Sequence, residues 1–278
     1  MFYCYTKAST DRPWNEDRCY VCKDFGFVLD GVSVNGGQKF SSYNSDAEWF
    51  SNRWKEYLKE NLPNTNKTLA DIMRSGINLI VNEYTAMAGE EKIIYFPALT
   101  ITMFRIIGSQ LQYFYLGDSE MLLKSKSGHV IQLLSEGPNL MDWENEMALT
   151  LLDTNKEGLI PVRKKQGADF ILNVHKHKKN TEGYYWVISD CEEAIKHASF
   201  GVIDKKIIDS IILVSDGFGQ IYNLFEIIDK NKMFKLNSEK IADKYYKKLY
   251  KAQEKDKFAK KYLRVKVRDD STIVYYKF

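Results

Sequence analysis

Hydrophobic residues in the first third of the chain predict three short strands followed by two helices. Apolar and aromatic residues are dense over 1–6, 18–22 and 25–29, and polar or glycine-containing stretches separate these runs. Runs of this length, bounded by turn residues, are typical of strands. Over 44–60 and 67–88 the apolar residues instead recur every three or four positions, which predicts amphipathic helices whose apolar stripes pack into the core.

The rest of the chain repeats this order of strands and then helices. It predicts strands over 98–107, 111–116, 120–124, 183–189, 207–214 and 271–278, with helices over about 218–232 and 238–260 between the last two strands. Short turns join the first three of these strands, as in a β-meander. Helices that come in blocks between runs of strands favour an α+β fold with antiparallel sheets, because a parallel doubly wound sheet would alternate strand and helix one by one.

Aspartates recur where these strands begin or end. The motifs are Asp30-Gly31, Gly117-Asp118, Ser215-Asp216-Gly217 and Asp269-Asp270. Strand ends hold carboxylates rigidly, and glycine beside them lets the backbone turn or approach a ligand. Aspartate and glycine are also common turn residues, so each motif alone has a purely structural explanation. Four such motifs in one chain indicate a carboxylate cluster, which suits the oxygen-preferring ions Mg²⁺ and Mn²⁺.

Composition narrows the choice of partners and of compartment. Of 278 residues, 44% are hydrophobic and 28% charged, as in ordinary globular proteins. The 40 basic and 37 acidic residues nearly balance, which gives no indication of a nucleic-acid partner. Lysine is concentrated over 230–268, where a solvated helix face is the simplest explanation. No apolar run is long enough to span a bilayer and no signal peptide is evident, so we expect a cytoplasmic protein without a membrane partner.

The four cysteines do not indicate a zinc or redox site. Cys19 and Cys22 form a lone C-x-x-C, and no second ligand pair at similar spacing accompanies it. The motif also lies in an apolar, strand-like stretch, so we interpret these cysteines as core or strand residues.

Five motifs follow one another along the chain: DRPWNEDR at 11–18, FGFVLDG at 25–31, QYFYLGDSEMLL at 112–123, DSIILVSDGF at 209–218 and RDDSTIVYY at 268–276. In this order they resemble the type 2C metal-dependent serine/threonine protein phosphatases, the PPM family, in its bacterial form. The resemblance spans nearly the whole chain and implies one phosphatase domain over 1–278. It also implies a four-layer α-β-β-α sandwich, in which two antiparallel sheets are flanked by helix pairs.

The resemblance implies a role for each matching residue. Asp30 would bridge two Mn²⁺ or Mg²⁺ ions, the Gly31 carbonyl would ligate one of them, and Asp216 and Asp269 would complete the other. Asp118, with Asp216, would line a third metal position. Glu16 and Asp17 would act around the metals through bound waters, and Arg12 would grip the substrate phosphate, which a planar guanidinium can contact with two hydrogen bonds. The implied reaction is hydrolysis of phosphoserine or phosphothreonine in proteins by metal-activated water.

Some positions depart from the family pattern and leave alternatives open. Val32 stands where eukaryotic members often have histidine, Glu120 stands where arginine usually follows the GDS motif, and the flap region at about 138–205 fits poorly. A catalytically weak pseudophosphatase that acts as a binding or regulatory module is therefore a second hypothesis. A hydrolase of small phosphate esters is a third, and a nucleic-acid binder using the lysine-rich helices is a fourth. The retained carboxylates favour an active enzyme.

Overall fold

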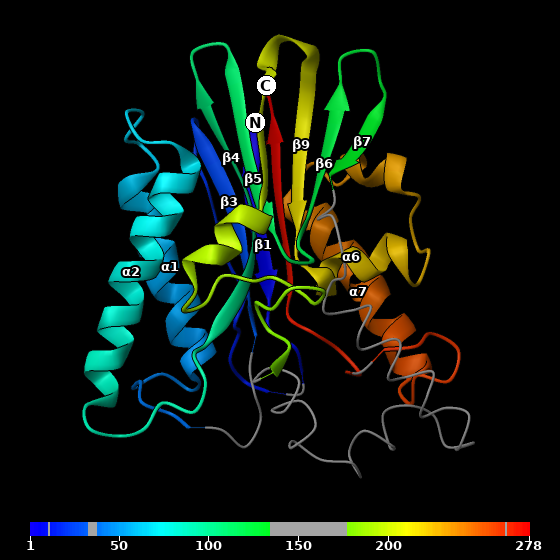
Figure 1. Cartoon of the computed structure of the whole chain (residues 1–278). Helices are drawn as coiled ribbons and strands as arrows, with labels where there is room; N and C mark the ends of the chain where they lie inside the picture. Colours follow the sequence, from blue (N-terminus) through cyan, green and yellow to red (C-terminus); the bar gives the residue numbers. More distant parts are fainter. Residues whose placement is uncertain (11, 33–37, 134–176, 265) are drawn as a thin grey trace.

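Two antiparallel five-stranded sheets form the centre of the molecule (Figure 1). The computed structural model describes residues 1–10, 12–32, 38–133, 177–264 and 266–278. The first sheet has the strand order β1 (Phe2–Lys7), β10 (Ser271–Lys277), β9 (Ile208–Val214), β6 (Glu120–Ser125) and β7 (Val130–Leu133). The second has the order β2 (Arg18–Val21), β3 (Phe25–Val32), β4 (Ala98–Ile107), β5 (Gln110–Leu116) and β8 (Ser199–Asp204).

Helices cover the outer face of each sheet. The helices α1 (Asp46–Asn61) and α2 (Leu69–Ala88) pack on the second sheet, while α6 (Asp216–Asn223) and α7 (Glu239–Lys255) pack on the first. Three short 3₁₀ segments complete the described elements: η1 (Glu192–His197), η2 (Lys205–Ile207) and η3 (Lys230–Lys235). The expected four-layer α+β sandwich is therefore confirmed.

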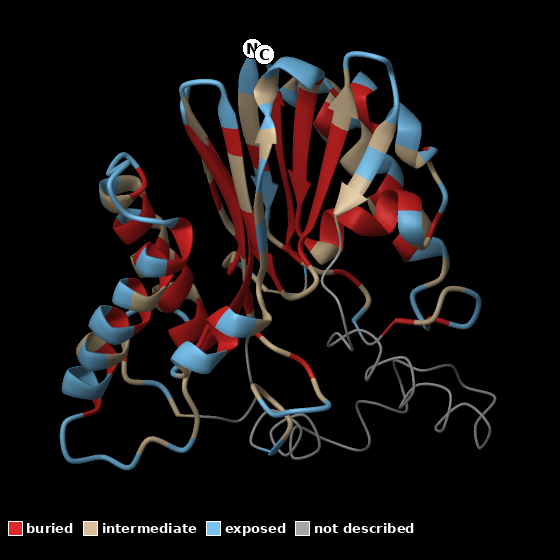
Figure 2. Ribbon diagram, turned by 45° about the horizontal axis from the view of Figure 1, so that its top comes forward, coloured by how far each residue is buried: buried red, intermediate tan, exposed pale blue. Residues whose placement is uncertain are grey.

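Three hydrophobic layers hold these elements together, and Figure 2 shows the buried residues along the sheets and the inward faces of the helices. Successive side chains of a strand point to opposite faces, so a strand between two layers is apolar on both. In β4, Ile101 and Met103 pack against α1 and α2, whereas Phe104 packs between the sheets. The layer between the sheets also contains Val28 and Leu213, one from each sheet.

The two N-terminal helices begin and pack as their sequences predict. Ser45 and Thr68 precede α1 and α2, and their side chains accept hydrogen bonds from the backbone N–H groups three residues later. Such caps satisfy donors that the first helical turn leaves without partners. Within α2, a Cβ at Gly76 would lie 2.6 Å from the Trp54 ring, so the lack of a side chain there lets the two helices meet closely.

Several element predictions need correction. The segment 183–189 forms only an isolated bridge, Leu99 to Ile188, because Tyr185 and Val187 pack beside the start of β4 without joining its ladder. The strands β7 and β8 were not predicted. The helix expected over 218–232 ends at Asn223, since the chain turns back there with Glu226 at a positive φ of 49°.

The predicted flap, about 138–205, lies partly outside the described residues, which resume at 177. Among the described helices, none combines the length and the apolarity needed to cross a bilayer.

Candidate metal centre

The predicted site residues come from strand ends that meet at one end of the sandwich, the lower end in Figure 1. Asp118 follows β5, Asp216 begins α6 directly after β9, and Asp269 precedes β10. Asp30 differs from the prediction, because it lies within β3 and not after it. The strand continues through Val32, and Asp30 pairs with Thr100 of β4 in the ladder. The backbone of both sheets therefore fixes where these carboxylates lie.

Asp30 and Asp216 face each other across the two sheets. Asp118 and Asp269 lie near enough for their charges to act on both. The side chains of Asp30 and Asp216 are half-buried, and protein atoms surround both carboxyl groups closely. Burial, first, and the neighbouring carboxylates, second, raise the pKa of Asp30 well above its ordinary value and that of Asp216 to about 7. Oδ1 of Asp216 is buried without a hydrogen-bond partner among the described residues.

Glu16 and Asp17 lie behind this pair, on the loop before β2, and both are almost completely buried. Burial, followed by the charge of Asp270, raises the pKa of Asp17 well above its ordinary value. The hydroxyls of Ser215 and Thr272 lie close enough to lower it in part, but neither Oδ atom of Asp17 has a hydrogen-bond partner within the described ranges. A buried carboxylate without partners is costly unless a cation or a proton compensates it.

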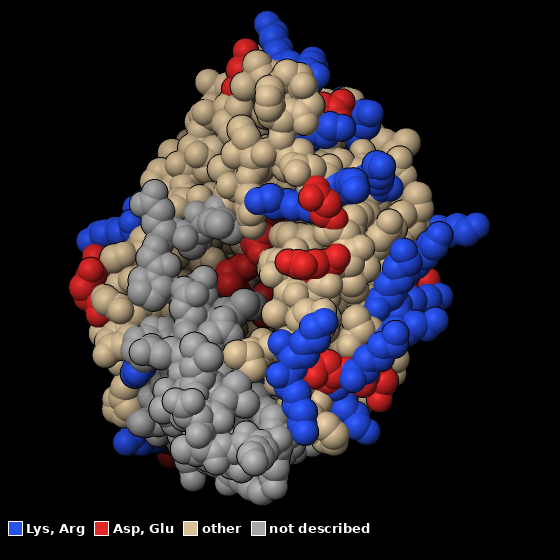
Figure 3. Space-filling view, turned by 90° about the vertical axis from the view of Figure 1, so that its right-hand side faces the viewer, with Lys and Arg blue, Asp and Glu red and all other residues tan. Residues whose placement is uncertain are grey.

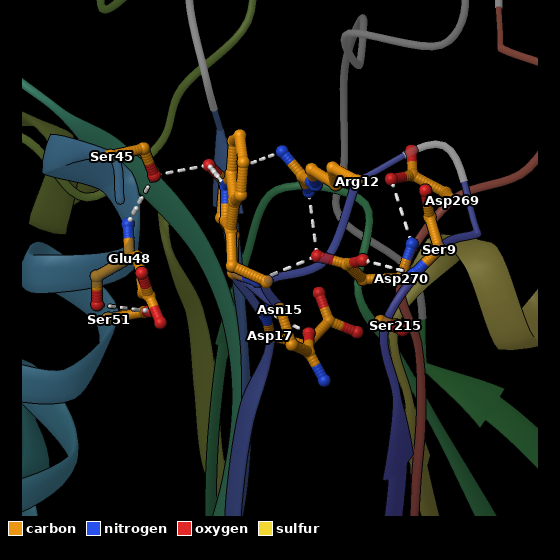
Figure 4. Close-up of polar contacts among 12 residues, drawn as sticks. Ser9, Arg12, Asn15, Asp17, Ser45, Glu48, Ser51, Ser215, Asp269 and Asp270 are labelled. Carbon is orange, nitrogen blue, oxygen red and sulfur yellow. Dashed lines mark hydrogen bonds and ion pairs between the residues drawn. The ribbon is translucent and has the colours of Figure 1, made fainter. Parts of the chain in front are cut away.

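Arg12 points into a network of carboxylates, as Figure 4 shows. Its Nη1 donates to Glu16, and its Nη2 donates to Oδ2 of Asp270 at 2.7 Å. Asp270 also accepts hydrogen bonds from the backbone N–H of Ser9 and of Glu16, each at 2.7 Å. Sequence reasoning gave Asp270 no role, although its place beside Asp269 could have drawn attention to it. It ties the loop that carries Arg12, Glu16 and Asp17 to the start of β10.

Two glycines allow the backbone segments of the site to approach closely. A Cβ at Gly31 would lie 2.8 Å from the carbonyl oxygen of Glu16, and one at Gly217 would lie 2.0 Å from that of Asp270. These distances are shorter than any van der Waals contact, so both positions need glycine. The glycine in each Asp-Gly motif therefore has a steric cause in this fold.

Other contacts that the sequence did not reveal fix the orientation of the site elements. Glu120 is buried in β6 and accepts hydrogen bonds from Tyr222, from Asn223 at 3.1 Å and from Gln132. It therefore anchors α6, the helix that begins at Asp216.

Asp269 forms an ion pair with Lys266 at 2.5 Å, so one predicted ligand has a cationic partner in this structure. Asp118 and Asp269 keep more contact with solvent than Glu16 and Asp17.

The donor set fits a hard divalent cation. Carboxylate oxygens dominate it, burial and then the neighbouring carboxylates raise the pKa of Asp30 and of Asp216, and three buried carboxylate oxygens of Asp17 and Asp216 lack partners among the described residues. Mg²⁺ and Mn²⁺ prefer such ligands. However, no three His, Cys, Asp or Glu side chains in the described parts of the chain have the spacing of a ready metal site. The carboxylates would have to move closer together to share an ion.

Comparison with known proteins supports the fold and gives no match by sequence. Neither a family model nor a curated protein matches the chain. Among solved structures, the serine/threonine phosphatase Stp1 from Staphylococcus aureus is 14% identical with a TM-score of 0.58, over 100% of this chain and 94% of that chain.

Two further solved structures with a similar fold are a phosphatase domain with bound manganese and a phosphatase of the PPM type. The catalytic domain of PstP in complex with 2 manganese ions is 15% identical with a TM-score of 0.58, covering 99% and 96% of the two chains. The PPM Ser-Thr phosphatase MsPP from Mycobacterium smegmatis, in complex with cacodylate, is 12% identical with a TM-score of 0.57, covering 100% and 98%. The chain therefore has the fold of the PPM-type serine/threonine phosphatases.

Proposed function

We propose that the chain is a metal-dependent phosphatase that removes phosphate from phosphoserine or phosphothreonine in proteins, as one domain over 1–278. The observation that carries this proposal is the meeting of Asp30, Asp118, Asp216 and Asp269 at one end of the sandwich, with buried carboxylate oxygens that lack partners among the described residues. The fold shared with PPM-type phosphatases supports it, as does the manganese found in one of them.

In this proposal the metal site uses the residues that the sequence motifs suggested. Asp30, the Gly31 carbonyl, Asp216 and Asp269 would hold two Mn²⁺ or Mg²⁺ ions, and Asp118 would contribute to a third position. Such ions, when bound, supply activation of a water molecule near neutral pH and stabilisation of charge on the phosphoryl group. Asp17 and Glu16 are both almost completely buried on the loop before β2, and Asp17, whose carboxylate oxygens lack partners among the described residues, would orient water around the ions. The carboxylate of Glu16, which accepts from Arg12, Trp14 and Ser45, would act from behind it.

Arg12 is the proposed phosphate-binding residue. Its guanidinium has five N–H donors, and the two described ion pairs use only Nη1 and Nη2. A substrate phosphate would therefore bind the remaining donors or displace one carboxylate. Because Glu16 and Asp270 hold the side chain in one orientation, they preorganise it at the edge of the carboxylate cluster.

The test is hydrolysis of p-nitrophenyl phosphate and of a phosphothreonine peptide with Mn²⁺, for the wild type and for Asp216→Ala. We expect metal-dependent turnover that the substitution reduces by at least about a hundredfold, as for loss of a group that stabilises the transition state. Glu91→Gln, which changes an exposed carboxylate in the loop after α2, is the matched control. Wild-type turnover in the presence of a chelator, or full activity of Asp216→Ala, would contradict the proposal.

A second candidate is a catalytically weak member that acts as a binding module. It is favoured by the two carboxylates that already engage Arg12. Binding of Mn²⁺ without hydrolysis of either substrate would support it. Turnover of the small ester but not of the peptide would instead indicate a hydrolase of small phosphate esters.

A further inference from the structure

The lysines of the C-terminal region collect on one surface of the molecule. Over 230–268 the sequence has 15 basic and 4 acidic residues, a surplus of 11, whereas the whole chain has a surplus of only 3. The other residues are therefore net negative by 8. This segment comprises η3, α7 and the loop that leads to β10, so the positive charge lies on the side of the sandwich that α6 and α7 cover.

Within α7 the lysines form a straight stripe. The lysine stripe comprises Lys240, Lys244, Lys247, Lys248, Lys251 and Lys255, all of them exposed. At about 100° per residue they fall within about 100° of the helix circumference and extend over about 22 Å. The buried residues Ala242, Leu249 and Gln253 lie on the opposite face.

Little negative charge balances this stripe. Lys247 pairs with Asp243 at 2.6 Å, and the other acidic residue near the stripe, Glu254, is engaged by Arg268. Among the described residues, Lys244, Lys251 and Lys255 have no acidic partner within ion-pair distance. The exposed faces of α1 and α2 differ, because acidic and basic residues alternate there, as in the pair Lys59 and Glu56. An ordinary solvated helix face would resemble α1 and α2.

The stripe leads to the carboxylate cluster. Arg268 pairs with Glu254 in the last turn of α7, and Asp269 is the next residue in the chain. Arg264 donates to the backbone oxygen of Gln253 at 3.1 Å, which fixes the same turn. Figure 3 shows Lys and Arg side chains over α7, beside a hollow with acidic atoms at its base.

We propose that the lysine stripe is a docking track for an acidic segment that flanks the phosphorylated residue of the substrate protein. This inference rests on the proposed function and adds a substrate class to it. An extended chain advances about 3.3–3.6 Å per residue, so about seven residues cover the stripe. The preferred substrates have Asp or Glu in roughly that many positions on one side of the phosphoresidue.

An acidic protein segment fits better than nucleic acid or a membrane. The stripe contains no arginine, the residue suited to bidentate contact with phosphates. The apolar face of α7 is buried against the sheet, so the helix cannot insert it into a lipid surface. Lysine ammonium groups are flexible point charges that suit a run of carboxylates.

The experiment compares three phosphothreonine peptides, with an acidic flank, with the same flank on the other side, and with a neutral flank. Activity with Mn²⁺ and binding by fluorescence anisotropy are measured for the wild type and for Lys244/Lys251/Lys255→Glu. The control, Lys67/Lys126/Lys206→Glu, changes net charge equally at exposed positions near the distant end of the strands. Lys244/Lys251/Lys255→Gln serves as a second variant in case charge reversal impairs folding.

We expect the KM and Kd of the acidic peptide to rise about tenfold in the stripe variant, the size expected for three exposed ion pairs. Its kcat, and turnover of p-nitrophenyl phosphate, should not change. The effect should weaken at high salt, since exposed charges are screened beyond about 10 Å at 0.1 M.

Three results would overturn this inference: no change for the acidic peptide, an equal change for the neutral peptide, or an equal change in the control variant. Tighter binding of an RNA 20-mer or of phosphatidylserine vesicles, lost in the stripe variant, would also overturn it. If the wild type hydrolyses no substrate, the proposed function fails, while the anisotropy arm still decides whether the stripe binds acidic segments.

Discussion

Removing one central carboxylate should stabilise the metal-free protein at alkaline pH. Asp216 is surrounded by Asp30, Asp118 and Asp269, and in chelator no metal ion compensates their charge, which Lys266 balances only in part. Replacement by Asn keeps the shape of the side chain and removes one charge. We therefore expect Asp216→Asn to gain stability against urea, relative to the wild type, between pH 4 and pH 8 in EDTA.

The magnitude follows from the pKa of Asp216, which rises from an ordinary value of 3.8 to about 7 in the folded protein. A carboxyl whose pKa is raised by folding stabilises the folded state while it is protonated. This contribution to the free energy of unfolding is complete below pH 3.8 and is lost as the pH rises through about 7. The difference between the folded and unfolded pKa values of Asp216 therefore lowers the free energy of unfolding of the wild type by about 4 kcal/mol at pH 8. The residual accessibility of the group and its coupling to Asp30 reduce this figure, so we expect about 2–4 kcal/mol.

Comparison of two pH values isolates this effect. Asn adds an amide that lacks obvious partners, which costs about 1–3 kcal/mol, but that cost is similar at pH 4 and pH 8. The assay is urea unfolding at both pH values in EDTA, with Glu91→Gln as the control. The variant should gain about 2–4 kcal/mol relative to wild type between pH 4 and pH 8. An unchanged or opposite difference would refute the reasoning that burial and the neighbouring carboxylates raise the pKa of Asp216.

Two further substitutions test steric features of the fold. Gly217→Ala would place a Cβ 2.0 Å from the carbonyl oxygen of Asp270, so we expect a loss of at least about 1–3 kcal/mol in urea unfolding, together with weaker Mn²⁺ binding by calorimetry. Gly219→Ala, whose nearest neighbour is 3.3 Å away, is the control, and an equal loss there would show that helix formation and not the close approach is responsible. Trp54→Ala should lower the free energy of unfolding by about 3–5 kcal/mol, because Trp54 is fully buried between α1 and α2. Leu79→Ala, on the exposed face of α2, should have little effect, and comparable losses would contradict the assigned packing.

Local sequence patterns were sufficient for most elements of the sandwich. The period of the apolar residues located α1, α2 and the β4–β6 meander within a few residues, because each packs one face or two faces against a continuous core. It failed for β8 and for the segment 183–189. β8 has no fully buried residue, since half-buried and exposed residues alternate along it, and it is held by its pairing with β5, while Tyr185 and Val187 are buried without a ladder. Whether an apolar run joins a sheet depends on the edge available to it.

The sequence alone placed Asp118, Asp216 and Asp269 next to strand ends, though not Asp30, which lies within β3, and the order of the motifs indicated the fold family to which the chain is similar. Only the tertiary structure decided which of them meet. Asp30 in β3 and Asp216 directly after β9 come from different sheets, and the contact of Asp270 with Arg12 joins residues 258 positions apart. Local spacing carries no information about such contacts. They depend on how two sheets pack, which the three hydrophobic layers determine together, and the charges at the strand ends are brought together as a consequence.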